Sequence, residues 1–355
     1  MRVADRSTGR NYLKYLNKAK SDYAKTNERI FSGNRFEKIS EDVSAGSRVL
    51  RARSEKYKVE KQLDNVKSIN EEMTSMETAM TSIEDILLEI HPMVSKAKTL
   101  TSGESGRNAL ANEIKAMREE ILQFANTKYG KRFVFGGTNA SQAPFTTDNN
   151  GKLLYNGVAV DSIKQAADGT YYYEAEESGV TVKKEIPMDG DVYLDIGLGI
   201  KVHEGSVNPT TGAETMPNVD PDTGFKLSFS GLELLGFGVN SEGVSNNIFN
   251  VLTEIENNIR NFNEEELEKY DNQFVALSDT FRANLTNIGA KTNFLDTMQT
   301  RLQQTADSYT SRISTLMGTN DAEESTHLTM NDYVLKAVLQ MGSQILPVSL
   351  MDFLS

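Results

Sequence analysis

The chain of 355 residues has no cysteine, only three histidines and no run of five basic residues. Without cysteine there is no disulfide framework, no thiolate nucleophile and no cysteine metal site. The histidines, His91, His203 and His327, show no paired spacing of the kind that binds zinc. Because phosphate binding needs a basic patch, a formal net charge of −12 argues against a nucleic-acid partner.

Long apolar runs are also missing. None approaches the ~20 residues that cross a bilayer, and the first 20 residues lack the apolar core of a secretory signal. By that test alone we expect a cytoplasmic protein. The lack of cysteine would equally suit an extracellular protein exported without a cleavable signal peptide, so both locations stay open at this point.

Apolar residues at helical spacing fill both ends of the chain. In the N-terminal part they predict a helix of about five turns that stops at Ser32-Gly33, then, after a polar turn region, a long helix from Val59 to Ala97 with a kink at Pro92. A third helix is predicted from Leu110 to Phe124. The pattern returns at Ile248 and continues, with breaks, to the C-terminus.

The middle of the chain has a different composition. Residues 130–239 contain 16 of the 25 glycines and five of the seven prolines, with short alternating runs between them. This pattern predicts a small antiparallel β domain joined by hairpins. The expected fold is therefore mainly α with an inserted β domain: an elongated antiparallel coiled-coil rod built from both chain ends.

The terminal stripes, roughly 12–30 and 330–354, are too short and isolated to be stable alone. The two ends can supply each other's apolar face within the chain, and we give packing between molecules, as an assembly interface, at least equal weight. The residues expected to carry it are Tyr12, Leu16, Tyr23, Val338, Met341, Ile345, Leu350 and Phe353.

Candidate catalytic and metal sites are weak. The acids Asp189, Asp191 and Asp195 lack EF-hand spacing, and His203-Glu204 is more typical of an exposed loop. The glycines of "GLELLGFGV" are interpreted as strand turns, because they do not form GxGxxG at the start of a helix. The run Tyr171-Tyr172-Tyr173 with nearby acids leaves a glycan-binding or hydrolytic domain as a further hypothesis, although strand alternation explains it more simply. We expect no enzyme activity, no cofactor and no metal.

Four segments resemble one family. The run "SGNRFEKISED" at residues 32–42 resembles the "SGxRI…SDDP" turn of bacterial flagellins and their junction relatives, with Glu41 and Val43 in place of the usual Asp and Pro. The segments "NT…RFVFGGTN" at 126–139, "PF…LYNG" at 144–157 and the ending "SLMDFL" resemble the junction proteins in particular. The family is the flagellar hook-associated protein 3 type of the flagellin superfamily.

The resemblance implies a structural subunit of the bacterial flagellum that connects hook to filament. It implies three domains: terminal helices 1–40 with 312–355 in the inner tube, a helical rod of 41–137 with 244–311, and a surface β domain of 138–243. Implied partners are further copies in a ring of about eleven, the other hook-associated junction protein, flagellin, and an export chaperone at the C-terminal helix. The implied location is extracellular, after export without a cleavable signal peptide. A flagellin-like filament subunit with a short outer domain is the alternative.

Overall fold

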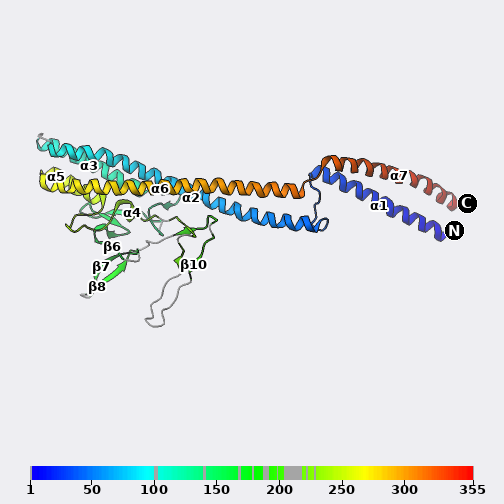
Figure 1. Cartoon of the computed structure of the whole chain (residues 1–355), viewed down its shortest axis with the longest axis horizontal. Coiled ribbons are helices and arrows are strands. Elements are labelled where there is room, and N and C mark those ends of the chain that lie inside the picture. The colour runs from blue at the N-terminus through cyan, green and yellow to red at the C-terminus, as the bar shows by residue number, and fades with distance from the viewer. Residues whose placement is uncertain are drawn as a thin grey trace. The chain divides into compact units, whose positions relative to one another are not determined.

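The computed structural model describes residues 2–99, 103–138, 141–166, 169–177, 180–186, 192–197, 199–203, 218–220, 223–227 and 229–354, without the side chains of 2–6, 99, 218 and 343–354. Long helices come from both ends of the chain and small antiparallel sheets from its middle (Figure 1). The mainly α fold with an inserted β region is confirmed. The chain divides into two compact units, Met1–Glu60 with Gln303–Ser355 (unit 1) and Lys61–Leu302 (unit 2).

Unit 1 pairs the two ends of the chain. Helix α1 (Arg2–Ser32) lies beside α7 (Asp321–Leu354), as Figure 1 shows. The predicted stop at Ser32-Gly33 is confirmed, because Gly33 has a φ of +65°, which favours glycine. Two backbone hydrogen bonds then join the turn after α1 to the segment before α7. The Arg35 N–H donates to the Met317 carbonyl at 2.6 Å, and the Thr319 N–H donates to the Gly33 carbonyl at 3.0 Å.

The next helix, α2 (Val43–Thr99), begins earlier than the sequence pattern predicted. We expected a polar turn region before Val59, but the polar stretch is already helical. Asp42 explains the start, because its Oδ1 accepts a hydrogen bond from the Ala45 N–H at 2.9 Å and so caps the helix. Arg35 holds the same carboxylate through Oδ2 at 2.7 Å.

A small apolar cluster fixes this turn within unit 1. Phe36, Ala45 and Val49 are buried, and they pack against Ile313 and Leu316 at the end of α6 (Glu264–Met317). The "SGNRFEKISED" segment thus folds as a capped turn with an apolar anchor at Phe36.

Unit 2 contains the continuous part of the core. Between Val66 and Val94, α2 buries side chains at alternating spacings of three and four. On α6 the buried apolar positions recur every seven residues from Phe274 to Leu295. Cross-helix pairs give the direction: Asn70 bonds Asp296 at 2.8 Å, and Glu84 bonds Arg282 at 2.9 Å. Since 14 residues forward on α2 correspond to 14 backward on α6, the two helices run antiparallel. α2 continues through Pro92 as one helix.

Two further helices cover the end of this pair. α3 (Glu104–Ala125) packs on α5 (Ile248–Asn261). Between them lies a buried ion pair, Arg118 to Glu256 at 3.2 Å, with the Arg118 guanidinium 5.0 Å above the Phe249 ring. Burial lowers the pKa of Arg118, and the Glu256 carboxylate opposes that shift. Removing one partner of such a buried ion pair should destabilise the fold, because the other charge would stay buried without a counter-charge.

The inserted region forms five small sheets, all with antiparallel pairing among the described strands. The strands are β1 (Lys128–Tyr129), β2 (Arg132–Phe133), β3 (Phe145–Thr147), β4 (Leu153–Tyr155), β5 (Val158–Ala159), β6 (Ile163–Gln165), β7 (Tyr171–Glu177), β8 (Val180–Glu185), β9 (Tyr193–Leu194), β10 (Val202–His203), β11 (Asn218–Val219) and β12 (Phe225–Lys226). The sheets are β1-β2, β3-β4-β5, β6-β7-β8, β12-β9 and β10-β11.

One interpretation of this region was wrong. The first glycine of "GLELLGFGV" is not in a strand turn: α4 (Gly231–Leu235) is a short helix. Ser230 caps its start by accepting a hydrogen bond from the Leu232 N–H, and Gly236 ends it with a φ of +85°. The buried leucines of α4 then face the core of unit 2.

Candidate assembly interface

The pair of α1 and α7 has a narrow, mixed core. Ala19 and Thr26 are buried on α1, and Thr26 Oγ1 accepts a hydrogen bond from Asn331 Nδ2 of α7 at 2.9 Å. Arg29 reaches the buried carboxylate of Glu324 at 3.5 Å. These contacts hold the two helices in register but bury few apolar side chains.

Gly342 leaves room for the end of the Tyr12 side chain near the chain ends. A β-carbon at this position would overlap the phenol oxygen of Tyr12. The close approach of α7 to the Tyr12 ring therefore depends on a residue without a side chain. Sequence reasoning did not identify this role, although a lone glycine within an apolar helical stripe is a recognisable signal.

α1 and α7 form a groove of about 630 Å³ that includes the Tyr12 ring. Its surface is mostly apolar, and polar groups from both helices also line it: Thr8, Asn11, Tyr12, Tyr15, Lys18, Ala19, Asp22, Asn331, Val334, Val338 and Met341. The groove is open to solvent, so it can receive side chains from another molecule.

The predicted interface residues fall into three groups. Tyr12, Val338 and Met341 line the groove. Leu16 and Tyr23 are half-buried on α1 and do not line it. The remaining three, Ile345, Leu350 and Phe353, have side chains outside the described part of the chain. Their role at an interface stays a prediction.

Other large apolar side chains on these helices were not in the predicted set. Tyr15 is 62% exposed, Met330 67% and Tyr333 75%. They lie outside the stripes that guided the sequence interpretation, which followed only one face of each helix. A helix that is apolar on more than one face has more than one packing partner.

The family-like motif at residues 126–157 comes together in unit 2. Asn126 Nδ2 donates to the Phe145 carbonyl at 2.9 Å, and its Oδ1 accepts from the Phe145 N–H at 3.1 Å. Phe135, Phe145 and Tyr155 are fully buried. Gly231 fits against this aromatic cluster, because a β-carbon there would lie 2.5 Å from the Phe145 ring.

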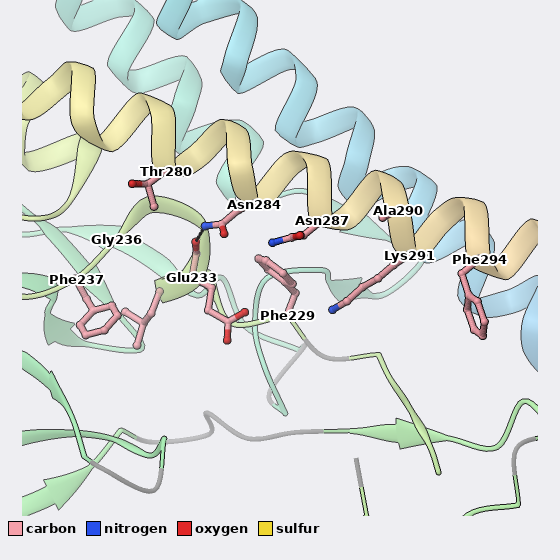
Figure 2. A pocket seen from close by; sticks show the side chains of 11 residues that line it. Phe229, Glu233, Gly236, Phe237, Thr280, Asn284, Asn287, Ala290, Lys291 and Phe294 are labelled. Atoms are coloured by element: carbon pink, nitrogen blue, oxygen red, sulfur yellow. Dashed lines mark hydrogen bonds between the residues drawn. The ribbon is translucent and has the colours of Figure 1, made fainter. Parts of the chain in front are cut away.

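Figure 2 shows a second groove, of about 640 Å³, between α4 and α6 in unit 2. The Lys291 ammonium lies 5.9 Å from the centre of the Phe229 ring, and Asn284 donates to the Glu233 carbonyl at 2.7 Å. Phe237 and Phe294 lie at its two ends. The Asn284 amide and the Lys291 ammonium already interact within the chain, and the described lining shows no paired acid and base or activated nucleophile.

The weak candidate sites remain scattered. In the described part of the chain, no three His, Asp or Glu side chains are close enough to hold a metal ion. Asp195 Oδ1 accepts a hydrogen bond from the Gly197 N–H at 2.8 Å, which is a turn contact, whereas Asp189, Asp191 and Glu204 lie outside the described residues. His91 stacks on Phe274 with ring centres 6.5 Å apart.

The tyrosine run lies on β7, where neighbouring residues point to opposite faces. Tyr171 packs edge-on against Phe237, and Lys183 covers the Tyr172 ring at 4.7 Å. The three rings therefore do not form one surface, as a stacking site for a sugar would need.

Several known proteins are similar to this chain. Residues 7–140 match the bacterial flagellin N-terminal helical region. Flagellar hook-associated protein 3 of Escherichia coli (strain K12) is 23% identical over 176 residues, which cover 48% of this chain and 53% of that protein. The alignment thus spans about half the length of the curated relative, and the resemblance to the hook-associated protein 3 type is confirmed.

A solved structure described as a flagellar hook-associated protein from Vibrio parahaemolyticus shares the fold, with a TM-score of 0.55 at 16% identity. The match covers 78% of this chain and 99% of that protein chain. Flagellar hook-associated protein 3 from Legionella pneumophila has a TM-score of 0.46 at 17% identity, covering 76% and 98%. These relatives are flagellar proteins and none is named as an enzyme, in agreement with the expectation for this chain. Among the described helices, none is apolar over enough residues to cross a bilayer.

Proposed function

We propose that this flagellin-type chain is a structural subunit at the hook–filament junction of the bacterial flagellum. It connects hook to filament through helical packing of its termini and carries out no chemical step. One observation carries the proposal: α1 and α7 form a pair whose apolar groove and exposed side chains are left for other molecules.

The three-domain division belongs to this proposal. Residues 1–40 with 312–355 would form the inner tube, 41–137 with 244–311 the rod, and 138–243 the outer β domain. The closed core of α2 and α6 suits a rod that folds by itself, and the open face of α1 and α7 suits a tube built by neighbours.

The proposed partners follow from the same role. They are further copies in a ring of about eleven, the other hook-associated junction protein on the hook side, and flagellin on the filament side. A flagellar export chaperone would cover the C-terminal helix before export. The proposed location is extracellular, in the bacterial flagellum.

Deletion of the gene tests the role. We expect cells with hooks but no filaments and with flagellin monomer in the medium, seen by electron microscopy and by assay of the culture supernatant. Re-expression of the chain should restore filaments. Intact filaments in the deletion strain would contradict the junction role and favour the alternative, a minor filament subunit of flagellin type.

A further inference from the structure

The methionine side chains of this protein differ widely in their exposure to solvent. Four of them, in the core of unit 2, are at most 4% exposed: Met73, Met76, Met80 and Met298. On α7 in unit 1, by contrast, Met330 is 67% exposed and Met341 is 57% exposed. A methionine that lies in water offers its sulfur atom to oxidants that cannot reach the core.

Met317, at the end of α6, is the intermediate case. Its side chain is half-buried, and its Sδ accepts a hydrogen bond from Arg53 Nη2 at 3.2 Å. Within the described part of the chain, no such donor reaches the sulfur of Met330 or Met341. These two side chains are therefore the most open to reaction among the methionines whose side chains are described.

Met341 differs from Met330 in its position. It lines the groove between α1 and α7 together with Tyr12 and Val338, whereas Met330 does not line it. The surface of this groove is mostly apolar, and the thioether of Met341 is part of that apolar surface. A polar atom added to Met341 would therefore lie in the surface that the proposed assembly buries.

Hydrogen peroxide converts a thioether into a sulfoxide in one two-electron step. A lone pair of the methionine sulfur attacks one peroxide oxygen and the O–O bond breaks. The transferred oxygen gives its proton to the departing hydroxide, which leaves as water, so sulfur is oxidised and peroxide is reduced. The product is a polar side chain with a hydrogen-bond acceptor, and burying that acceptor without a donor costs free energy.

We propose that Met341 is a peroxide-sensitive modification site that controls assembly: oxidation of the free, folded chain at Met341 stops its incorporation into the flagellum. The shielded methionines of unit 2 stay reduced, so the modification changes the groove and leaves the fold intact. The inference rests on the proposed assembly role and adds a chemical reaction that regulates it.

The reactivity is tested on the purified full-length chain. A short treatment with dilute hydrogen peroxide, followed by peptide mass spectrometry, should show one added oxygen on Met330 and on Met341. The four core methionines of unit 2 should remain reduced, and they serve as the internal control. Circular dichroism before and after treatment should be the same, because the oxidised positions are exposed.

Glutamine variants test the effect on assembly without peroxide, because glutamine is polar, uncharged and about as long as methionine sulfoxide. In the deletion strain, Met341→Gln should lower the amount of chain in isolated flagella about fivefold. Met341→Leu keeps an apolar side chain of similar volume and should lower it by no more than about twofold. The matched control is Leu88→Gln, which makes a comparable change at a 54% exposed position of unit 2 and should have no effect.

Assembly should in turn protect Met341 from the oxidant. Isolated flagella and the free chain are treated with the same concentration of peroxide and compared by mass spectrometry. We expect about fivefold less sulfoxide at Met341 in the assembled chain, because neighbours cover the groove. Met76, which has no exposed area, should stay reduced in both samples and shows that the chain remained folded.

Four results would overturn the proposal: an unreactive Met341 in the free chain, normal incorporation of Met341→Gln, an equal loss with Leu88→Gln, or equal oxidation of Met341 in free and assembled chains. Failure of the junction role looks different, because it is read from filaments in the deletion strain. If filaments form without this protein while the chain still enters flagella, the role falls and the comparison at Met341 still decides the inference. If the unmodified chain never enters flagella, both fall.

Discussion

The two helix pairs of this chain have opposite kinds of surface. In unit 2, α2 and α6 bury a continuous apolar seam, in which Val66, Met76 and Ile83 have no exposed area. In unit 1, α1 and α7 bury little apolar area and leave Tyr15, Tyr333 and others in solvent. Both pairs are antiparallel helices from distant parts of one chain. The difference is that α2 and α6 cover their apolar seam within the chain, whereas α1 and α7 leave apolar side chains that the proposed assembly would cover.

Burial explains the contrast in energetic terms. At about 25 cal/mol per Å² of apolar area removed from water, a seam of fully buried side chains stabilises its pair without help. The exposed side chains of α1 and α7 gain nothing until another surface covers them. Their burial is thus available to assembly rather than to folding.

The largest effect on unfolding is expected at the centre of the seam. Ile83→Asp places a carboxylate where no side-chain area is exposed, and should cost more than about 4 kcal/mol. Urea unfolding followed by circular dichroism measures it. Leu88→Asp on the same helix is the matched control, because Leu88 is 54% exposed, and its cost should be near zero. Equal costs at both positions would mean that the seam does not hold unit 2 together.

A smaller but clear effect is expected at Gly231. Its alanine variant brings a β-carbon against the Phe145 and Tyr155 rings and should destabilise unit 2 by about 3 kcal/mol. Gly103→Ala, where the surrounding space is open, should leave the urea midpoint nearly unchanged. A neutral Gly231→Ala would indicate that the aromatic cluster can rearrange freely.

In unit 1 the corresponding test is Gly342→Ala. Overlap with Tyr12 should displace its ring and loosen the packing of α1 on α7 locally, at a cost of about 1 kcal/mol, because a half-open pair can adjust more easily than a closed core. Hydrogen exchange of amides in α1 reads this out better than global unfolding. Gly9→Ala on α1, which meets nothing within 4 Å, should slow exchange instead through better helix propensity.

A still smaller effect depends on pH. Burial raises the pKa of Glu72 above its usual 4.5, and Arg132, with its Nη2 4.0 Å from the Glu72 carboxylate, opposes this only in part. The folded state then holds its proton at higher pH than the unfolded state, so this group lowers stability as pH rises from about 4.5. Glu72→Gln should therefore shift the urea midpoint upward at pH 7 relative to wild type, and less at pH 4. The same shift at both pH values would rule out a titration effect.

The sequence predicted the helices well because their signal is periodic. The stop at Gly33 and the long stripes of α2 and α6 depend on local spacing. The early start of α2 was missed because the cap at Asp42 is a single hydrogen bond in a polar segment. α4 was missed because five residues carry too little periodicity to distinguish a helix from a turn.

The groove between α1 and α7 was predicted only in part. Periodicity marked Tyr12, Val338 and Met341 as members of apolar stripes, and they line one groove. It could not show that Gly342 fits against Tyr12, because that contact joins residues 330 positions apart. Nor could it show that Phe31 stays in solvent, since exposure depends on which face of α1 the rest of the chain covers.

The smallest effect on unfolding is expected where the effect on assembly is greatest. Met341 is 57% exposed in the groove of unit 1, so Met341→Asp should leave the urea midpoint of the isolated chain unchanged. In an assembly that buries this side chain, the same carboxylate would be taken out of water without a partner, at a cost sufficient to prevent incorporation. Quantifying the variant in isolated flagella of the deletion strain, with Leu88→Asp as the matched exposed position of unit 2, separates the two readouts. Normal incorporation of Met341→Asp would mean that neighbours leave this face open to water.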